Sequence, residues 1–289
     1  MIDQSNGPRQ QYVMTTQSKD RTGIIADLTT CLAAHGGFVT ALSQFGTPDN
    51  ERFFSRIKFN LNDDKKAAFL TELHAICERH ELKTRIHGAK DKMPTLLMVS
   101  KFDHCLNDLL YRVRSGALRI DVRAIVSNHP NAKPLADAAG IPFHHIPVTK
   151  ETKPQAEAAL RKVIDDTKVD LIVLARYMQI LSESVCEDYS GRIINIHHSF
   201  LPSFKGAKPY HRAYEKGVKM IGATAHYVTT DLDEGPIIEQ AVQRVDHKLE
   251  PKDLIAVGRD VECKALARAV RLHATHRSFI NGNKTVILD

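Results

Sequence analysis

Apolar and polar positions divide the chain into two stretches that differ in period. Up to residue 88, short runs of alternating apolar and polar residues flank two segments in which apolar residues recur every three or four positions. Alternation is typical of half-buried strands, and the longer period is typical of amphipathic helices. We therefore expect helices over 24–34 and 64–78, and strands over 11–16, 38–45, 53–59 and 83–87. This order of elements predicts the split, ferredoxin-like βαββαβ unit.

A polar stretch over residues 89–94 ends in proline and predicts a linker. Beyond it, short apolar runs alternate with helical segments, which is typical of parallel βαβ units in an open sheet with helices on both faces. The expected domains are therefore 1–88 and 95–289. In the second domain we expect strands over 95–99, 121–126, 171–174 and 193–196, two longer antiparallel strands over 220–228 and 236–245, a helix over 252–276 and a last strand over 285–288.

Composition narrows the class of protein. The chain of 289 residues is 43% apolar and 26% charged, which is enough apolar material for two cores. The net charge of +6 comes from Lys and Arg interleaved with Asp and Glu, which favours a solvated surface over a nucleic-acid-binding tract. A polar N-terminus and the lack of an apolar run of about 18 residues argue against secretion or membrane insertion. Together with five scattered cysteines that form no Cys-x-x-Cys pair, they predict a cytoplasmic protein.

The most informative chemistry lies at the end of the strand expected over 193–196. Asn195 and His197 are two positions apart, so both side chains project from the same face of that strand. Open parallel sheets bind their ligands at the carboxyl ends of the strands. An Asn amide can donate to a developing oxyanion, and a neighbouring His can carry a proton. This pair indicates acyl-group chemistry at that edge of the sheet.

A third candidate, Asp233, lies in a Gly-Pro turn between the two longer strands. A carboxylate near His197 could orient the imidazole and position a water molecule for attack. Sequence spacing does not by itself bring Asp233 to Asn195. Taken singly, each of the three residues is more often a turn former or a structural residue. The residues alone therefore indicate a hydrolytic site without naming its substrate.

Two sequence motifs, taken together, resemble the signature of a known family. The run from Asn195 to Gly206 reads Asn-Ile-His-His-Ser-Phe-Leu-Pro-Ser-Phe-Lys-Gly, and Asp-Glu-Gly-Pro-Ile begins at Asp233, which follows His197 by 36 positions. This pattern resembles the Asn-x-His-x-Ser-x-Leu-Pro and Asp-x-Gly-Pro-Ile signature of the folate-dependent formyltransferases. The resemblance covers about 95–289. It implies a Rossmann-like sheet, 10-formyltetrahydrofolate as the ligand, and catalytic roles for Asn195, His197 and Asp233.

The same resemblance implies further contacts with the folate. The main chain of the segment that contains Met178, Gln179, Ile180 and Leu181 is similar to the part that holds the pterin ring in this family. His226 matches an active-site histidine. From the residues alone, the segment reads equally well as ordinary core and His226 more readily as a buried strand histidine. No metal ion or further cofactor is expected, because the folate is itself the substrate.

Two features favour hydrolysis over transfer. Glycinamide formyltransferases place a glycine-rich loop after the first strand of this domain, where backbone N–H groups approach the phosphate of the acceptor. Here residues 100–106 contain no glycine, and Phe102 and Asp103 disfavour a phosphate. Residues 20–24, Asp-Arg-Thr-Gly-Ile, resemble the first turn of an ACT regulatory domain. An ACT domain followed by a formyltransferase-like domain is similar to the layout of the formyltetrahydrofolate deformylase family.

These resemblances imply a hydrolase that converts 10-formyltetrahydrofolate to formate and tetrahydrofolate, feeds formate to purine synthesis and balances one-carbon pools. They also imply a homo-oligomer, because ACT domains assemble edge to edge, with glycine or methionine as candidate effectors. Two alternatives remain open. One is a folate-dependent formyltransferase that acts on an amine acceptor. The other is a non-catalytic protein that binds folate or senses amino acids.

Overall fold

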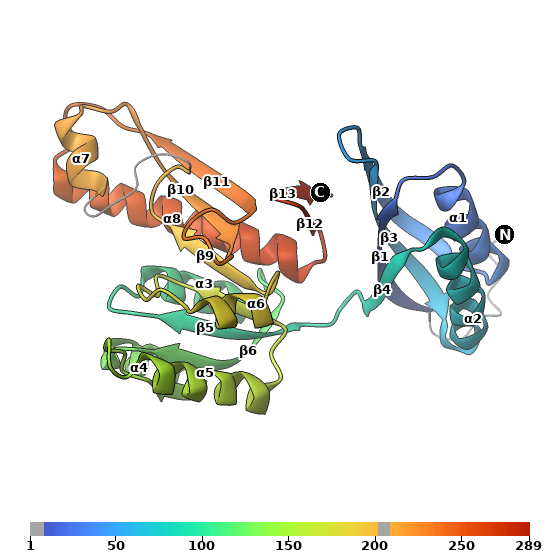
Figure 1. The fold of residues 1–289 in the computed structure, drawn as a ribbon, viewed down its shortest axis with the longest axis horizontal. Helices are drawn as coiled ribbons and strands as arrows, with labels where there is room; N and C mark the ends of the chain where they lie inside the picture. The colour runs from blue at the N-terminus through green and yellow to red at the C-terminus, as the bar shows by residue number, and fades with distance from the viewer. Residues whose placement is uncertain (1–8, 202–208) are drawn as a thin grey trace. The chain divides into compact units, whose positions relative to one another are not determined.

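The computed structural model describes residues 9–201 and 209–289, which Figure 1 shows as a ribbon. Contacts divide the chain into two compact units. The first contains the residues up to Asp91 together with Thr275–Asn281 and Val286–Asp289, and the second contains Lys92–Ala274 and Gly282–Thr285. The sequence assigned everything from residue 95 onward to the second domain. The difference arises because the last strands of the chain pack onto the first unit.

The first unit is an antiparallel sheet with two helices. Its strands are β1 (Arg9–Lys19), β2 (Phe38–Thr47), β3 (Arg52–Asn62) and β4 (Lys83–Gly88), in the order β2-β3-β1-β4. Its helices are α1 (Ile24–Ala34) and α2 (Asp63–His80). With β1 and β3 paired at the centre, this is the strand order of the split βαββαβ unit. The predicted fold of this unit is confirmed.

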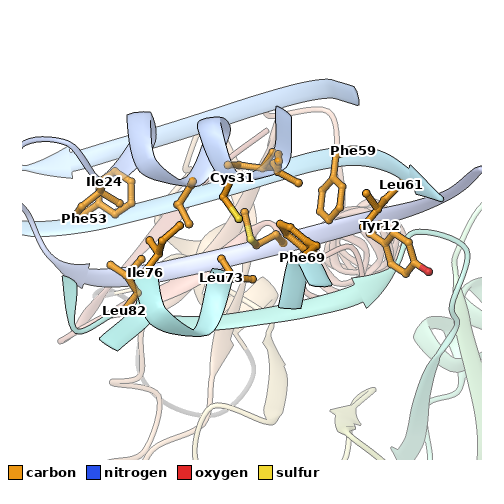
Figure 2. Packing of buried hydrophobic residues seen from close by; sticks show 14 residues of the cluster. Tyr12, Ile24, Cys31, Phe53, Phe59, Leu61, Phe69, Leu73, Ile76 and Leu82 are labelled. Carbon is orange, nitrogen blue, oxygen red and sulfur yellow. The ribbon is translucent and has the colours of Figure 1, made fainter. Parts of the chain in front are cut away.

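Both helices bury their apolar stripes against one face of that sheet (Figure 2). Leu28 and Leu32 of α1 are fully buried, and Phe69 of α2 meets Phe59 of β3 edge to face, with ring centroids 5.6 Å apart. Burying a side chain of this size contributes about 1.5–3 kcal/mol. The first helix begins after Gly23, whose φ of 96° is in the left-handed region that favours glycine.

The last residues of the chain form a hairpin. Its strands are β12 (Ser278–Asn281) and β13 (Lys284–Ile287), joined at Gly282, which has φ 61°. Phe279 and Leu288 pack on Phe54, so these residues build a small second core in the first unit. The sequence predicted β13 but missed β12. Four residues with one buried side chain are too short to show a period.

The second unit contains a seven-stranded sheet in the order β11-β10-β9-β8-β5-β6-β7. Five of the strands are parallel, namely β5 (Met93–Val99), β6 (Ile120–Ser127), β7 (Phe143–His145), β8 (Leu171–Leu174) and β9 (Ile193–His197). The last two are antiparallel, namely β10 (Met220–Tyr227) and β11 (Ile237–Arg244). The mostly parallel open sheet and its antiparallel edge are as predicted. The short β7 was not predicted.

Helices cover both faces of this sheet. Leu96 and Met98 of β5 pack toward α5 (Lys153–Thr167), so the alternate residue Leu97 faces the opposite side, where it is also fully buried. On that side α3 (His104–Arg114) contacts α8 (Pro251–Ala274), which lies across β9, β10 and β11. The other helical segments are η1 (Pro130–Ala132), α4 (Lys133–Ala139), α6 (Glu183–Asp188) and α7 (Pro209–Glu215). Among the described residues, no helix is long and apolar enough to cross a membrane.

The strand order places a switch point between β5 and β8. The chain leaves β5 toward β6 on one side, whereas β8 and β9 continue on the other. At such a point the connections diverge and leave room for a ligand at the carboxyl ends of the strands. Ser100 follows β5 here, donates to Asn128 Oδ1 at 2.6 Å, and accepts the backbone N–H of Met178 at 2.9 Å. The glycine-free turn after β5 is thus tied directly to the segment after β8.

Candidate active site

The site is built on the end of β9 and on β10 beside it. Asn195 and His197 lie on the same face of β9, and the antiparallel register puts His226 of β10 directly opposite Asn195. The two side chains meet, with Asn195 Nδ2 3.2 Å from His226 Nε2. His226 Nδ1 donates to the carbonyl of Tyr227 at 2.8 Å. Because that carbonyl can only accept, Nδ1 carries a proton.

Asp233 reaches this pair from the turn between β10 and β11. Its Oδ2 lies 3.2 Å from His197 Nδ1, and its Oδ1 lies 3.6 Å from His226 Nε2. The backbone of Asp233 has φ 58°, in the left-handed region that residues other than glycine seldom adopt. The antiparallel pairing of β10 with β9 carries this turn back to the end of β9. The contact that spacing alone left open is therefore made by the fold.

Gly235 makes that turn possible. A Cβ atom at this position would lie 1.8 Å from the carbonyl oxygen of Tyr227. The backbone approaches so closely because Tyr227 N donates to Pro236 O at 2.9 Å. A side chain at 235 would push the turn outward and move the carboxylate of Asp233 with it.

The charge on Asp233 is strongly favoured. Hydrogen bonds from His197 and then His226 hold the pKa of the Asp233 carboxyl well below its usual range, against the opposing effect of burial. An ionised carboxylate only accepts, so His197 Nδ1 is the donor of their hydrogen bond. The other ring nitrogen, Nε2, is buried and has no hydrogen-bond partner among the described residues. In the neutral ring it is a base, held in place from behind by Asp233.

The segment suggested for folate binding is a loop after β8. Met178 and Ile180 are 54% and 63% exposed, while Gln179 and Leu181 are half-buried. The loop follows directly on Leu174, which pairs with Asn195 of β9. An exposed apolar loop therefore stands at the carboxyl end of the strand beside the site. The expectation that its main chain binds a pterin stays a prediction.

A buried group of polar side chains adjoins the site, and the sequence did not predict it. Glu262 of α8 is 1% exposed and accepts from His104 Nε2 at 2.8 Å and from the Tyr210 hydroxyl at 2.7 Å. Arg176 Nε lies 3.4 Å from the same carboxylate, and Arg176 Nη1 lies 2.7 Å from His198 Nδ1. One signal was available, since Glu262 interrupts the apolar stripe of a long helix, where a carboxylate needs partners.

Other candidates are resolved differently. His273 near the end of α8 is turned inward, with its Nδ1 2.8 Å from the Tyr227 hydroxyl, and burial lowers its pKa to about 4. Lys205 and Lys208, two lysines in or next to the motif that begins at Asn195, lie outside the described residues. Among the described residues, two groups bring His, Cys and Glu ligand atoms close together, Cys31–His35–Glu72 and His104–Cys105–Glu262. Neither group includes Asn195, His197 or Asp233.

Comparisons with known proteins identify the family of this chain. The formyl transferase family model matches residues 93–270. The formyltetrahydrofolate deformylase of Corynebacterium sp. (strain P-1) is 49% identical over 280 residues, which cover 96% of this chain and 98% of that protein. That of Escherichia coli (strain K12) is 37% identical and covers 96% of this chain and 99% of its own length. The chain belongs to the formyltetrahydrofolate deformylase family.

Solved structures separate this family from its neighbours. The crystal structure of formyltetrahydrofolate deformylase from Burkholderia mallei ATCC 23344 has a TM-score of 0.94 and 48% identity, and it covers 97% of this chain and 100% of its own. The glycinamide ribonucleotide transformylase 1 from Symbiobacterium toebii has a TM-score of 0.64 and 31% identity, covering 68% of this chain and 95% of its own. The deformylases thus share both units, whereas the transformylase matches only part of the chain.

We predict that Gly235→Ala destabilises the protein by about 1–3 kcal/mol, because the new methyl group overlaps the Tyr227 carbonyl and the turn has to move. The free energy of unfolding in urea measures this. Asp231→Ala is the matched control, since it changes an exposed side chain in the same turn. A Gly235→Ala variant as stable as the control would show that the turn does not depend on glycine.

The depressed pKa of Asp233 predicts a pH dependence of stability. A carboxyl whose pKa is lower in the folded state stabilises it above the unfolded pKa of about 3.9, and the contribution is lost as pH falls through the folded value. We expect wild type to be more stable than Asp233→Asn at about pH 6, with the difference shrinking toward about pH 3. Urea unfolding across that range measures both proteins. A difference that stays constant with pH would contradict the depressed pKa of Asp233.

Proposed function

We propose that the protein hydrolyses 10-formyltetrahydrofolate to formate and tetrahydrofolate. The observation that carries the proposal is the His197–Asp233 pair. Its ring nitrogen Nε2 is buried and unpaired among the described residues, and Asn195 lies on the same strand face. This arrangement supplies a base, an anion that orients the base, and an amide donor for an oxyanion. Near full-length similarity to deformylases supports formyl transfer to water as its chemistry.

The geometry suggests a role for each residue. His197 Nε2 takes a proton from a water molecule as its oxygen attacks the formyl carbon, and Asp233 stabilises the imidazolium that forms. The carbonyl oxygen becomes an oxyanion, to which the Asn195 amide donates. When the intermediate collapses, the bond from carbon to the folate nitrogen breaks and His197 returns the proton to that nitrogen. Formic acid and tetrahydrofolate leave, and His197 is neutral again.

His226 and the loop after β8 have supporting roles in this proposal. His226 contacts both Asn195 and Asp233, so it fixes the direction of the amide relative to the carboxylate. The loop with Met178, Gln179, Ile180 and Leu181 follows the strand that pairs with β9, and its exposed Met178 and Ile180 side chains suit a flat heteroaromatic ring such as a pterin. Its main chain is held at Met178 by Ser100.

The turn after β5 favours water over a phosphorylated amine as the acceptor. The hydroxyl of Ser100 donates to the side chain of Asn128 and accepts from the backbone N–H of Met178. These two hydrogen bonds close the turn. Phe102 stands beyond it with its ring 5.6 Å from the guanidinium of Arg259. A phosphate would need glycine at these positions for its oxygens to reach the backbone N–H groups. These contacts support hydrolysis rather than transfer.

The first unit suits a regulatory role. Its βαββαβ fold and its first turn, with Gly23 in the left-handed region, support the ACT-like assignment. We propose that it binds an amino acid such as glycine or methionine, that the chain forms a homo-oligomer through this unit, and that the enzyme works in the cytoplasm. There its formate would feed purine synthesis and balance one-carbon pools.

Replacing the proton-handling pair tests the site. We predict that His197→Ala and Asp233→Asn each lower kcat for formate release by about 10²–10⁴-fold, because a positioned base contributes that much. Folate binding persists, since neither side chain is assigned to the pterin; titration with tetrahydrofolate measures it. Asp231→Asn, an exposed carboxylate of the same turn, is the control and retains wild-type kcat. Near-normal turnover would remove the variant's residue from the mechanism.

The acceptor is tested without any amine present. We expect purified protein and 10-formyltetrahydrofolate to release formate and tetrahydrofolate in equal amounts, because water is the only nucleophile the mechanism needs. Formate measured by a coupled dehydrogenase checks this, and repeating the assay with glycine or methionine tests the effectors. A rate that requires an amine acceptor would identify a transferase. Folate binding without turnover would identify a non-catalytic folate-binding protein.

A further inference from the structure

Behind the site lies a buried charge cluster that the mechanism above does not use. We call Glu262, Arg176, His104 and Tyr210 the Glu262 cluster. Its members come from α8, the segment after β8, α3 and α7, so four parts of the second unit converge on one carboxylate. Burial raises the pKa of Glu262, but the His104 hydrogen bond, the charge of Arg176 and the Tyr210 hydrogen bond outweigh it and hold the pKa below its usual value. The carboxylate is therefore charged.

The fold makes room for this cluster. Gly258 lies one helical turn before Glu262 on α8, and a Cβ atom there would lie 2.2 Å from the hydroxyl oxygen of Tyr210. The missing side chain at 258 thus lets Tyr210 reach Glu262. Arg176 has φ 66°, an unusual backbone conformation that directs the chain away from β8. Cys105 stands near His104 and Glu262, but Arg176 already supplies the positive charge that a metal ion would bring.

Arg176 links the cluster to His198. A guanidinium only donates, so Arg176 Nη1 donates to His198 Nδ1 across 2.7 Å, and His198 keeps its own proton on Nε2. Burial, then the charges of Arg176 and His197, lower the pKa of His198 to about 4. Glu262 and Asp233 oppose that effect without cancelling it. His198 is therefore a neutral ring at the pH where the enzyme works.

His198 stacks on His197. Their ring centroids are 5.0 Å apart and their planes differ by 21°. Two imidazolium ions at that distance would repel each other, so a fixed neutral His198 leaves His197 as the only ring of the pair that takes a proton. The charged guanidinium of Arg176 thus lies against the ring that stacks on His197. Glu262 offsets that charge within the cluster.

We propose that Glu262 and Arg176 are positioning residues that act through His198 and keep the catalytic proton on His197 alone. The inference rests on the proposed function, since it deepens the role of His197. It links the Glu262 carboxylate on α8, through Arg176 and His198, to the stacked rings at the end of β9. Neither Glu262 nor Arg176 needs to touch the substrate.

Glu262→Gln tests the proposal through the pH profile. The amide keeps the shape of the side chain but leaves the charge of Arg176 uncompensated beside the two histidines. We expect the acid limb of kcat/KM to move down by about one pH unit, because a nearby positive charge lowers the proton affinity of His197. We expect kcat to fall about 3- to 10-fold, because a weaker base transfers the proton less well, while KM for the folate stays unchanged. Glu250→Gln, an exposed carboxylate at the start of α8, is the matched control.

Two variants of His198 test the proposal without changing the buried carboxylate of Glu262. His198→Asn places an amide oxygen where Nδ1 stood, so it can still accept from Arg176, whereas His198→Leu cannot. We expect wild-type acid limb and kcat for His198→Asn and a displaced limb with lower kcat for His198→Leu. Identical pH profiles for wild type, Glu262→Gln and His198→Leu, in folded protein, would overturn the proposal and leave the cluster a purely structural anchor. Failure of the proposed function is distinct, because wild type itself would then release no formate at any pH.

Discussion

The contact between the carboxylate of Asp233 and the imidazole of His197 is the interaction on which the rest of the site depends. It exists because β10 runs antiparallel beside β9, so that the turn after β10 returns to the end of β9. The backbone of Gly235 lies so close to the carbonyl of Tyr227 that only glycine fits there, and this contact positions the turn. Once Asp233 is in place, it fixes which nitrogen of His197 carries the proton and which is free to act as a base. A local backbone constraint thus sets the geometry of the His197–Asp233 pair.

The site also shows how hydrogen bonds and opposite charges offset the cost of burying a carboxylate. A charged carboxylate inside a protein is costly unless every oxygen finds a partner. Asp233 is held by two histidines, and Glu262 by a histidine, a tyrosine and an arginine. The two groups meet at the stacked rings of His197 and His198. Charges that would each destabilise the core alone form one connected network at the carboxyl ends of the strands.

The comparison with transformylases illustrates that chemistry is decided by the site rather than by the fold. The transformylase from Symbiobacterium toebii matches 68% of this chain at 31% identity, with a TM-score of 0.64. In this chain the turn after β5 is closed by Ser100, which holds Asn128 and the backbone of Met178. These two hydrogen bonds tie together the segments that follow β5, β6 and β8. The same framework can therefore present a different acceptor.

The sequence by itself determined the elements whose side-chain period is long enough to read. The helix over 24–34 is α1 residue for residue, and Asn195 and His197 share a face because they are two apart on a strand. The short β7 and β12 escaped prediction because each has at most one buried side chain and so forms neither an apolar run nor a clear alternation. The meeting of Asp233 with His197, and of Glu262 with Arg176 and His198, was decided only by the tertiary structure. Periodicity is a local property, whereas these contacts depend on which strands pair and on how a distant helix packs across them.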